Sequence, residues 1–154
     1  MELKVGDKAP SFKLKNQDGK TISLADLKGK PIVLYFYPKD DTSGCTKEAC
    51  NFRDEFPKFG KIKAKIIGVS ADSVESHKKF VEKYKLPFNL LSDEKKEVVE
   101  KYGVWKEKNM YGRKYMGIVR TTFIINASGK ISNIFSKVKV NKHNQEVMEA
   151  LKEL

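Results

Sequence analysis

The sequence predicts a single α/β domain, residues 1–154, in which helices flank a mixed central sheet of about five strands. Short apolar runs bounded by proline, glycine or polar residues alternate with segments of helical periodicity through the first hundred residues. Two strand-like segments near the C-terminus are separated by a four-residue turn, and a final helix follows them. This order of elements is typical of a sheet covered by helices. The chain is also long enough to build one such core without disulfides or metals.

The N-terminal part predicts a β-hairpin. Residues 11–15 and 20–24 alternate between apolar and polar side chains, and they flank Asn16-Gln17-Asp18-Gly19. The Asp-Gly pair is a strong signal for a tight turn between antiparallel strands. A brief helical turn is expected at residues 26–29, where a glycine ends it.

A buried strand is predicted at residues 32–37, because six consecutive aliphatic or aromatic residues follow Pro31. A polar loop follows this strand. A helix then continues through Phe59, because Phe52, Phe56 and Phe59 recur at helical spacing. We expect Gly60 to end that helix.

The order of strand and helix then repeats twice. The predicted elements are strand 66–69, helix 72–85, strand 87–91 and helix 94–102. Asp72 with Glu75 three residues later resembles a capping box at the start of the first of these helices. Gly103 stands where the second helix should end.

The last third of the chain is expected to close the sheet. Residues 110–117 show no regular pattern. Residues 119–125 and 130–135 predict two antiparallel strands joined at residues 126–129. Residues 143–154 predict an amphipathic helix that covers one face of the sheet. The complete order fits a thioredoxin-like topology.

The charge balance keeps a basic nucleic-acid-associated domain open as a binding-class alternative. The chain has 31 basic and 20 acidic residues, a formal net charge of +11. Only three of the basic residues are arginines, and the lysines are dispersed as on solvated helix and strand faces. We therefore expect a solubilising surface and no specific nucleic-acid partner. Binding that weakens steeply with salt would indicate the alternative.

Membrane attachment and secretion are not expected. No apolar run approaches the roughly 20 residues that span a bilayer, and residues 1–20 lack the apolar block of a signal peptide. The sequence predicts a cytoplasmic protein, and a monomer or weak dimer because no long apolar stripe requires association. In a reducing cytosol, Cys45 and Cys50 are expected to act as thiols.

Cys45 is the candidate reactive residue. It lies in the first turn of the helix that follows the buried strand, where unpaired N–H groups and the helix dipole favour a thiolate. The thiolate is the form that attacks electrophiles. Gly44 leaves space beside the sulfur, and Thr42 is placed to cap the helix and to direct its hydroxyl toward the sulfur. An isolated helical cysteine is otherwise more often a core residue, and this context argues against that interpretation.

Pro38, Thr42 and Cys45 match the peroxiredoxin signature P-x-x-x-T-x-x-C, and Arg120 matches the active-site arginine of that family. The resemblance covers nearly the whole chain. Other matching segments are residues 5–12, 102–105 and 110–112. The C-x4-C spacing of Cys45 and Cys50 resembles the Q-type branch, also called the bacterioferritin comigratory protein group.

The resemblance implies a thiol-dependent peroxidase that serves antioxidant defence and needs no cofactor. Cys45 would reduce hydrogen peroxide or an organic hydroperoxide and become a sulfenic acid. Cys50 would resolve it as an intramolecular disulfide, and thioredoxin or a similar dithiol protein would be the reductant. Thr42, Gly44, Cys45 and Arg120 would bind the substrate. Pro38, which has no N–H, would pack against the site and limit water.

The residue types suit this chemistry. Cleavage of an O–O bond by a thiolate needs a cation and hydrogen-bond donors for the charge that develops on the leaving oxygen. Arg120 is a permanent cation, and the Thr42 hydroxyl and the helix N–H groups are donors.

The spacing of the two cysteines sets a geometric condition. On a continuous helix, Cα atoms five residues apart are roughly 8 to 9 Å apart, whereas a disulfide needs less than about 7 Å. If Cys45 and Cys50 share one helix, at least one turn must unwind before they can form a bond.

Two other chemistries compete with this interpretation. A thioredoxin-like thiol-disulfide oxidoreductase would share the fold, but such enzymes use C-x-x-C rather than C-x4-C. A zinc site could be assembled from Cys45, Cys50, His77 and His143, which are suitable ligand types. Their spacing does not support it, so no metal is expected, and the histidines are interpreted as surface or partly buried structural residues.

The remaining polar and aromatic residues near the motif receive structural interpretations. Asp40, Asp41 and Glu48 are expected to be solvated or helix-capping charges. Trp105, Met110 and Tyr111 are expected to belong to the core rather than to an apolar entrance for organic hydroperoxides.

Overall fold

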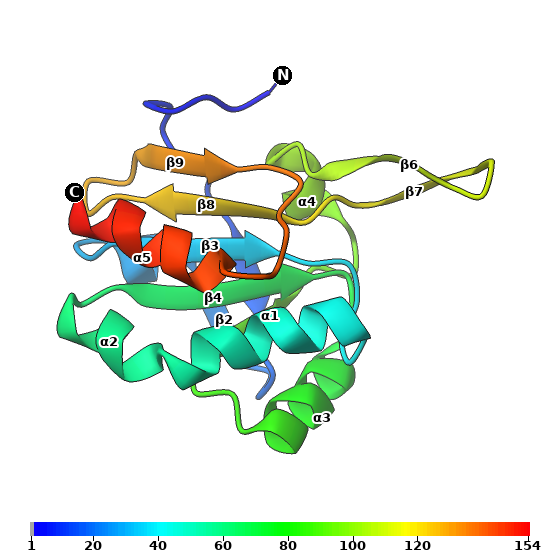
Figure 1. Ribbon diagram of the computed structural model, residues 1–154, viewed down its shortest axis with the longest axis horizontal. Coiled ribbons are helices and arrows are strands. Elements are labelled where there is room, and N and C mark those ends of the chain that lie inside the picture. Colours follow the sequence, from blue (N-terminus) through cyan, green and yellow to red (C-terminus); the bar gives the residue numbers. More distant parts are fainter. Residues whose placement is uncertain (1) are drawn as a thin grey trace.

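The computed structural model describes residues 2–154 and contains a central sheet with helices on both sides (Figure 1). Its elements, in chain order, are β1 (Lys13–Lys15), β2 (Thr21–Ser23), the 3₁₀ helix η1 (Leu24–Leu27), β3 (Ile32–Phe36), α1 (Ser43–Asp54), α2 (Phe56–Lys61), β4 (Lys65–Ser70), α3 (Val74–Tyr84), β5 (Asn89–Ser92), α4 (Glu97–Lys101), β6 (Trp105–Met110), β7 (Arg113–Ile118), β8 (Thr121–Ile125), β9 (Ile131–Phe135) and α5 (His143–Lys152).

The main sheet has the strand order β2-β1-β5-β4-β3-β8-β9. β3, β4 and β5 are parallel, and β8 and β9 are antiparallel to their neighbours. These five strands form the predicted mixed sheet. The predicted N-terminal hairpin is also present, and it extends the sheet to seven strands through one residue pair, Lys15 with Ser92. The thioredoxin-like arrangement is therefore confirmed.

β3 is buried along its whole length because both faces of the sheet are covered. Val33 and Tyr35 face a cluster that includes apolar side chains of α1, α2, α3 and α5. Leu34 and Phe36 face a second cluster with η1 and α4. Alternating side chains of one strand thus contribute to both cores, which explains the continuous apolar run.

Several predicted helix boundaries are wrong. The helix expected to continue through Phe59 is two helices, because Pro57 in the first turn of α2 has no N–H to continue α1. Gly60 does not end the second helix but lies inside it. α3 is capped by Ser73, whose Oγ accepts the Ser76 N–H at 3.1 Å, and not by Asp72.

The segment predicted to be irregular forms an antiparallel hairpin, β6–β7, that projects from the body (Figure 1). Tyr111 and Gly112 have φ values of 52° and 80°, as in a type I′ turn that joins two strands directly. Met110 and Tyr111 are exposed at its end, so their predicted place in the core is wrong. Trp105, at its base, is partly buried against the core.

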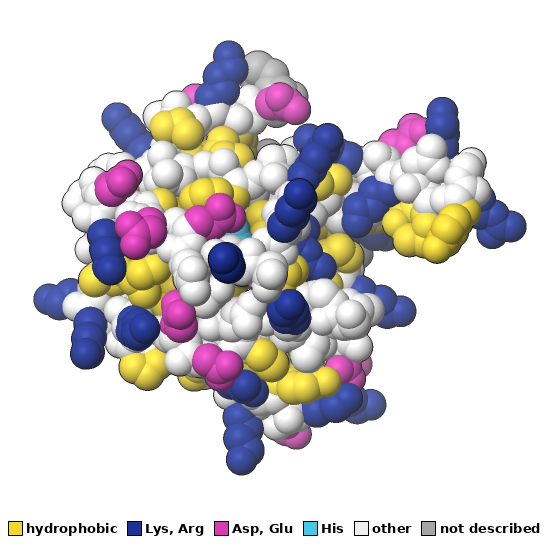
Figure 2. Space-filling model, viewed as in Figure 1, with side chains coloured by type: hydrophobic (Ala, Val, Ile, Leu, Met, Phe, Trp, Pro, Cys, Tyr) yellow, Lys and Arg dark blue, Asp and Glu magenta, His cyan; other side chains and the backbone are white. Residues whose placement is uncertain are grey.

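The surface carries its positive charge as separate side chains. On the face drawn in Figure 2, lysine and arginine side chains extend singly, with acidic groups between them. An apolar patch appears at the end of the β6–β7 hairpin, where Met110, Tyr111, Tyr115 and Met116 are exposed. No helix within residues 2–154 combines the length and the apolar character needed to cross a membrane.

The close packing of β3, β4 and β5 should make Gly68 intolerant of a side chain. A Cβ there would lie 2.7 Å from Leu90 Cδ2 and 2.8 Å from Tyr35 Cζ, inside a fully buried layer. We expect Gly68→Ala to lower the free energy of unfolding of the reduced protein by roughly 1–3 kcal/mol, measured by urea denaturation. Gly60→Ala is the matched control, because a Cβ there meets nothing within 4 Å. It should raise stability by up to about 1 kcal/mol. Equal effects of the two variants would contradict this packing.

Candidate active site

Cys45 lies where the buried strand β3 passes through a short loop into α1. Thr42 is the N-cap residue of α1, so Cys45 is the third residue of the helix. Backbone N–H groups in this first turn have no partner within the helix. Cys45 is 2% exposed and belongs to the apolar cluster that contains Tyr35 and Tyr37. The predicted position of the thiol at the helix N-terminus is confirmed.

Arg120 connects the thiol with a carboxylate. It lies between β7 and β8, and its Nη2 donates a hydrogen bond to Cys45 Sγ at 3.2 Å. Its Nη1 donates to Glu48 Oε1 at 2.6 Å. The Arg120 side chain is only 16% exposed, so its charge is weakly screened by solvent. The guanidinium therefore places a positive charge directly beside the Cys45 sulfur.

Glu48 is buried beneath this pair, and its predicted role as a solvated or capping charge is wrong. It lies one helical turn after Cys45, on the same face of α1. Burial raises its pKa to about 7, against the opposing effect of the Arg120 charge. Its second oxygen, Oε2, has no hydrogen-bond partner among residues 2–154. The spacing of three residues from the cysteine is the sequence signal that could have identified it.

Gly44 allows the guanidinium to approach the helix. A Cβ at this position would lie 3.2 Å from Arg120 Nη2, which is tighter than ordinary van der Waals contact. The predicted open space beside Cys45 is therefore occupied by Arg120. A larger residue would push the guanidinium away from the sulfur.

Thr42 differs from its prediction in one respect. It is the N-cap residue, and its carbonyl accepts the first helical hydrogen bond from Thr46 at 2.8 Å. Its hydroxyl makes no capping bond but donates to the Lys39 carbonyl at 2.9 Å. The oxygen of this exposed hydroxyl remains an acceptor for a ligand. Pro38 is half-buried in the same loop.

Cys50 lies five residues after Cys45 on the same continuous helix, and both thiols are free. It is partly buried, and burial raises the pKa of its thiol. The two sulfurs thus have different surroundings, since Cys45 contacts a guanidinium. With α1 intact, the helical geometry keeps their Cα atoms roughly 8 to 9 Å apart.

Lys108 is a second cation near the site, and no sequence pattern distinguishes it from the other lysines. It is half-buried on β6, in a hairpin whose other residues are mostly exposed. Its aliphatic chain lies over Gly117, where a Cβ would come within 3.1 Å of Lys108 Cδ. Burial lowers its pKa and the Arg120 charge lowers it further, whereas Cys45 acts in the opposite direction.

The two histidines are fully buried, so their predicted surface or partial exposure is wrong. His77 is bonded to Asp40 and to the Leu91 carbonyl. His143 is bonded to Thr122 and Glu146, and burial lowers its pKa. The structure therefore engages both ring nitrogens of each histidine in separate networks and does not bring them to the cysteines.

A buried thiol held at a helix N-terminus by a guanidinium, on a thioredoxin-like fold, defines the class of thiol-dependent peroxidases. Comparison with known proteins agrees. Residues 5–134 match the AhpC/TSA family. The chain is 53% identical over 151 residues to "Putative peroxiredoxin bcp" of Coxiella burnetii, covering 98% of this chain and 100% of the relative. It is 50% identical over 154 residues to "Peroxiredoxin Bcp" of Bacillus subtilis, covering 100% and 98%.

Solved structures lead to the same group. A cysteine-to-serine mutant of PrxQ from Xylella fastidiosa superimposes with a TM-score of 0.94 at 36% identity, covering 99% of this chain and 98% of that one. Xanthomonas campestris bacterioferritin comigratory protein superimposes with a TM-score of 0.88 at 42% identity, covering 92% of this chain and 90% of that one. The chain belongs to the AhpC/TSA family, within its Bcp or Q-type peroxiredoxins.

The raised pKa of Glu48 predicts a pH-dependent stability. The folded protein retains the Glu48 proton between the ordinary glutamate pKa and about 7, whereas the unfolded chain releases it. The free energy of unfolding should therefore fall as the pH rises through this window. Glu48→Gln cannot titrate, so the difference between wild type and variant should change by roughly 1–3 kcal/mol between pH 5 and pH 8. Urea denaturation of the reduced proteins tests this, and parallel pH profiles would contradict it.

Proposed function

We propose that Cys45 reduces hydrogen peroxide and organic hydroperoxides as the peroxidatic thiol, that Cys50 resolves the product, and that a dithiol protein completes the cycle. The contact of Arg120 Nη2 with Cys45 Sγ at the N-terminus of α1 carries this proposal. It combines a cation, free backbone donors and a nucleophile at one place. A core cysteine would need none of these.

In the first step, the Cys45 thiolate attacks one peroxide oxygen. An S–O bond forms and the O–O bond breaks, so that the sulfur is oxidised by two electrons. The other oxygen leaves as hydroxide or alkoxide, takes up a proton, and becomes water or an alcohol. Arg120 and the N–H groups of the first turn of α1 stabilise the charge on the oxygens. The Thr42 oxygen can accept a hydrogen bond from the hydroperoxide O–H group.

In the second step, the Cys50 thiolate attacks the sulfur of the Cys45 sulfenic acid. An S–S bond forms, the S–O bond breaks, and the leaving hydroxide is protonated to water. The continuous helix holds the two residues too far apart for this bond. The first turns of α1 therefore unwind before the disulfide forms, which makes local unfolding a step of the cycle.

In the third step, a thioredoxin-like dithiol protein reduces the disulfide by thiol–disulfide exchange. The partner supplies two electrons and two protons and is itself oxidised to a disulfide. The cycle uses no cofactor or metal, because the thiols carry all the electrons. Thr42, Gly44, Cys45 and Arg120 form the substrate site, with Pro38 packed beside them.

The range of substrates follows from the relatives as well as from the site. The Xanthomonas campestris protein is described by its alkyl peroxide reduction activity. The site offers a charge and hydrogen-bond donors for the two peroxide oxygens, and neither contact requires a particular organic group. We place the protein in the cytoplasm, where a dithiol reductant is available, and we expect a monomer or a weak dimer.

Mass spectrometry under anaerobic conditions tests the roles of the two cysteines. One equivalent of hydrogen peroxide, and in parallel an alkyl hydroperoxide, should convert the reduced wild type to a form lacking two hydrogens and cross-linked between Cys45 and Cys50. Cys50→Ser should instead trap a one-oxygen adduct on Cys45, because no thiol resolves it. Cys45→Ser is the control and should remain unmodified. An adduct on Cys50 in that control, or an unreactive wild type, would refute the proposal.

A further inference from the structure

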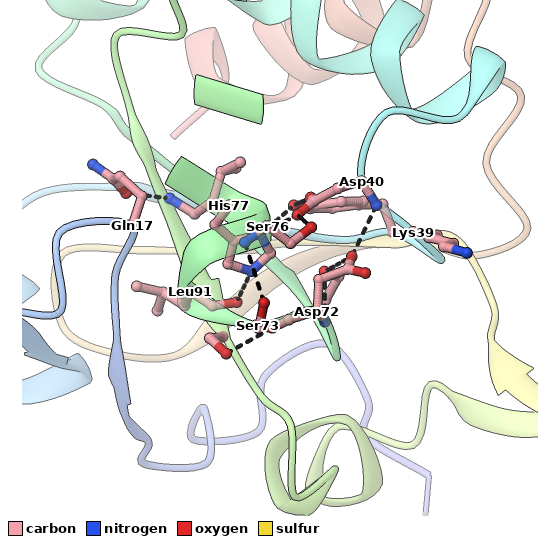
Figure 3. Close-up of polar contacts among 12 residues, drawn as sticks. Gln17, Lys39, Asp40, Asp72, Ser73, Ser76, His77 and Leu91 are labelled. Atoms are coloured by element: carbon pink, nitrogen blue, oxygen red, sulfur yellow. Dashed lines mark hydrogen bonds and ion pairs between the residues drawn. The ribbon is translucent and has the colours of Figure 1, made fainter. Parts of the chain in front are cut away.

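The loop between β3 and α1, residues 38–42, is hydrogen-bonded to a buried polar network that takes no part in the proposed peroxidase chemistry (Figure 3). The Asp40 side chain is 4% exposed and points into this network. Its Oδ1 accepts the Tyr37 hydroxyl at 2.6 Å. Its Oδ2 accepts the Ser76 hydroxyl of α3 at 2.8 Å. Asp40 is thus fixed to the helix that lies beside the active-site loop.

His77, also on α3, joins this loop to the sheet. Its Nδ1 lies 2.6 Å from Asp40 Oδ2, and its Nε2 lies 2.9 Å from the Leu91 carbonyl of β5. A carbonyl only accepts hydrogen bonds, so Nε2 carries a hydrogen. The fully buried ring is therefore a rigid bridge with two bonded ends.

Two further contacts fix the backbone of the loop. The Asp40 N–H donates to Asp72 Oδ2 at 2.8 Å, and Ser70 Oγ donates to the same oxygen at 2.6 Å. Asp41 has a φ of 55°, and its carboxylate accepts from Lys83 and Tyr84 of α3, both at 2.8 Å. A left-handed residue is stable only where its surroundings hold it.

Three residues of this network also have the side-chain types of a metal site. Asp40, Asp72 and His77 could each offer a ligand atom, and these atoms lie within 4.8 Å of one another. However, Asp72 Oδ2 already accepts two hydrogen bonds from protein donors, and Asp40 Oδ2 accepts one from Ser76 and lies 2.6 Å from His77 Nδ1. The donor set accounts for these oxygens without a cation, so the network is better explained as a fixed support.

We propose that Asp40 and His77, here called the loop anchor, are positioning residues that hold residues 38–42 in place while the first turns of α1 unwind and refold. The inference rests on the proposed function, because it assigns the boundary of the local unfolding that resolution requires. Residues beyond Thr42 leave their helical positions, whereas the loop stays bonded to α3 and β5. The fixed Thr42 then provides the first carbonyl acceptor from which α1 re-forms around Cys45.

Two substitutions of His77 separate positioning from general stability. The amide nitrogen of His77→Asn can occupy the place of Nδ1 and donate to Asp40. The amide nitrogen of His77→Gln can occupy the place of Nε2 and donate to Leu91 instead. Both variants replace a buried ring with an uncharged amide. If His77 only stabilised the fold, the rates of the two variants would not depend on which of them keeps the bond to Asp40. His143→Gln is the matched control, because it removes a buried histidine of α5 that does not contact the loop.

The readouts are the rate constant of peroxide with the reduced protein and hydrogen exchange in each redox state. His77→Gln should slow Cys45 oxidation by about 10- to 100-fold through misplacement of the site. His77→Asn and His143→Gln should retain most of the rate. In the oxidised wild type, amides of residues 46–51 should lose protection while the Asp40 amide keeps it, and His77→Gln should expose that amide as well.

Either of two results would overturn the loop anchor: equal rates for the Asn and Gln variants of His77, or loss of Asp40 amide protection when the wild type is oxidised. If His77→Gln does not fold, Asp40→Asn is the alternative variant, because it changes the Asp40–His77 bond on the loop side. It should slow oxidation in the same way, and a full wild-type rate would also overturn the proposal. Failure of the proposed function looks different, because Cys45 of the wild type would then not react with peroxide at all.

Discussion

The bridging guanidinium of Arg120 is the interaction on which the rest of the site depends. One nitrogen contacts Cys45 Sγ and another contacts Glu48 Oε1, so a single planar group links the thiol to a buried carboxylate. A buried charge is costly unless it is paired and hydrogen-bonded. The surroundings meet that requirement: Gly44 gives the guanidinium room, and Glu48 lies one helical turn beyond Cys45 to receive it. The fold brings these groups together because β3, which leads into α1, pairs directly with β8, which follows Arg120.

The placement proposed to make Cys45 reactive also keeps it apart from Cys50. The first turn of a helix offers free N–H groups and the positive end of the dipole, and both favour a thiolate. The same helix holds Cys50 beyond the reach of a disulfide. A sulfenic acid that waits too long can be oxidised further. The proposed cycle therefore needs a helix that is stable when reduced and opens after oxidation, together with a loop that stays fixed to guide its return.

Much of this arrangement could be predicted from the sequence, because it depends on local signals. The apolar run of β3, the Asp-Gly turn of the N-terminal hairpin and the cysteine that follows the buried strand are all short-range patterns. The predictions were wrong where a single residue competed with a periodic pattern. Pro57 divides the helix despite the phenylalanines at helical spacing, and Ser73 displaces Asp72 as the cap of α3.

Long-range polar contacts could not be predicted from the sequence. Glu48 and Asp40 look like solvated charges, and only the tertiary fold gives them Arg120 and His77 as partners. The sequence does not predict the β6–β7 hairpin, because its two-residue turn, Tyr111-Gly112, is not among the strongest turn sequences. Its residues are also mostly exposed, so they carry no strong apolar alternation.

The most direct test of the bridging role of Arg120 is the second-order rate constant for hydrogen peroxide with the reduced Arg120→Lys protein. A lysine keeps the charge but has one compact head group, which cannot hold both Cys45 and Glu48 in the planar geometry of a guanidinium. We expect the rate constant to fall by at least about tenfold, as for the loss of one charged hydrogen bond. Arg53→Lys, at a partly exposed ion pair with Asp54 that does not contact Cys45, should leave it unchanged. An Arg120→Lys protein that reacts as fast as the wild type would show that charge alone is sufficient and would contradict this account.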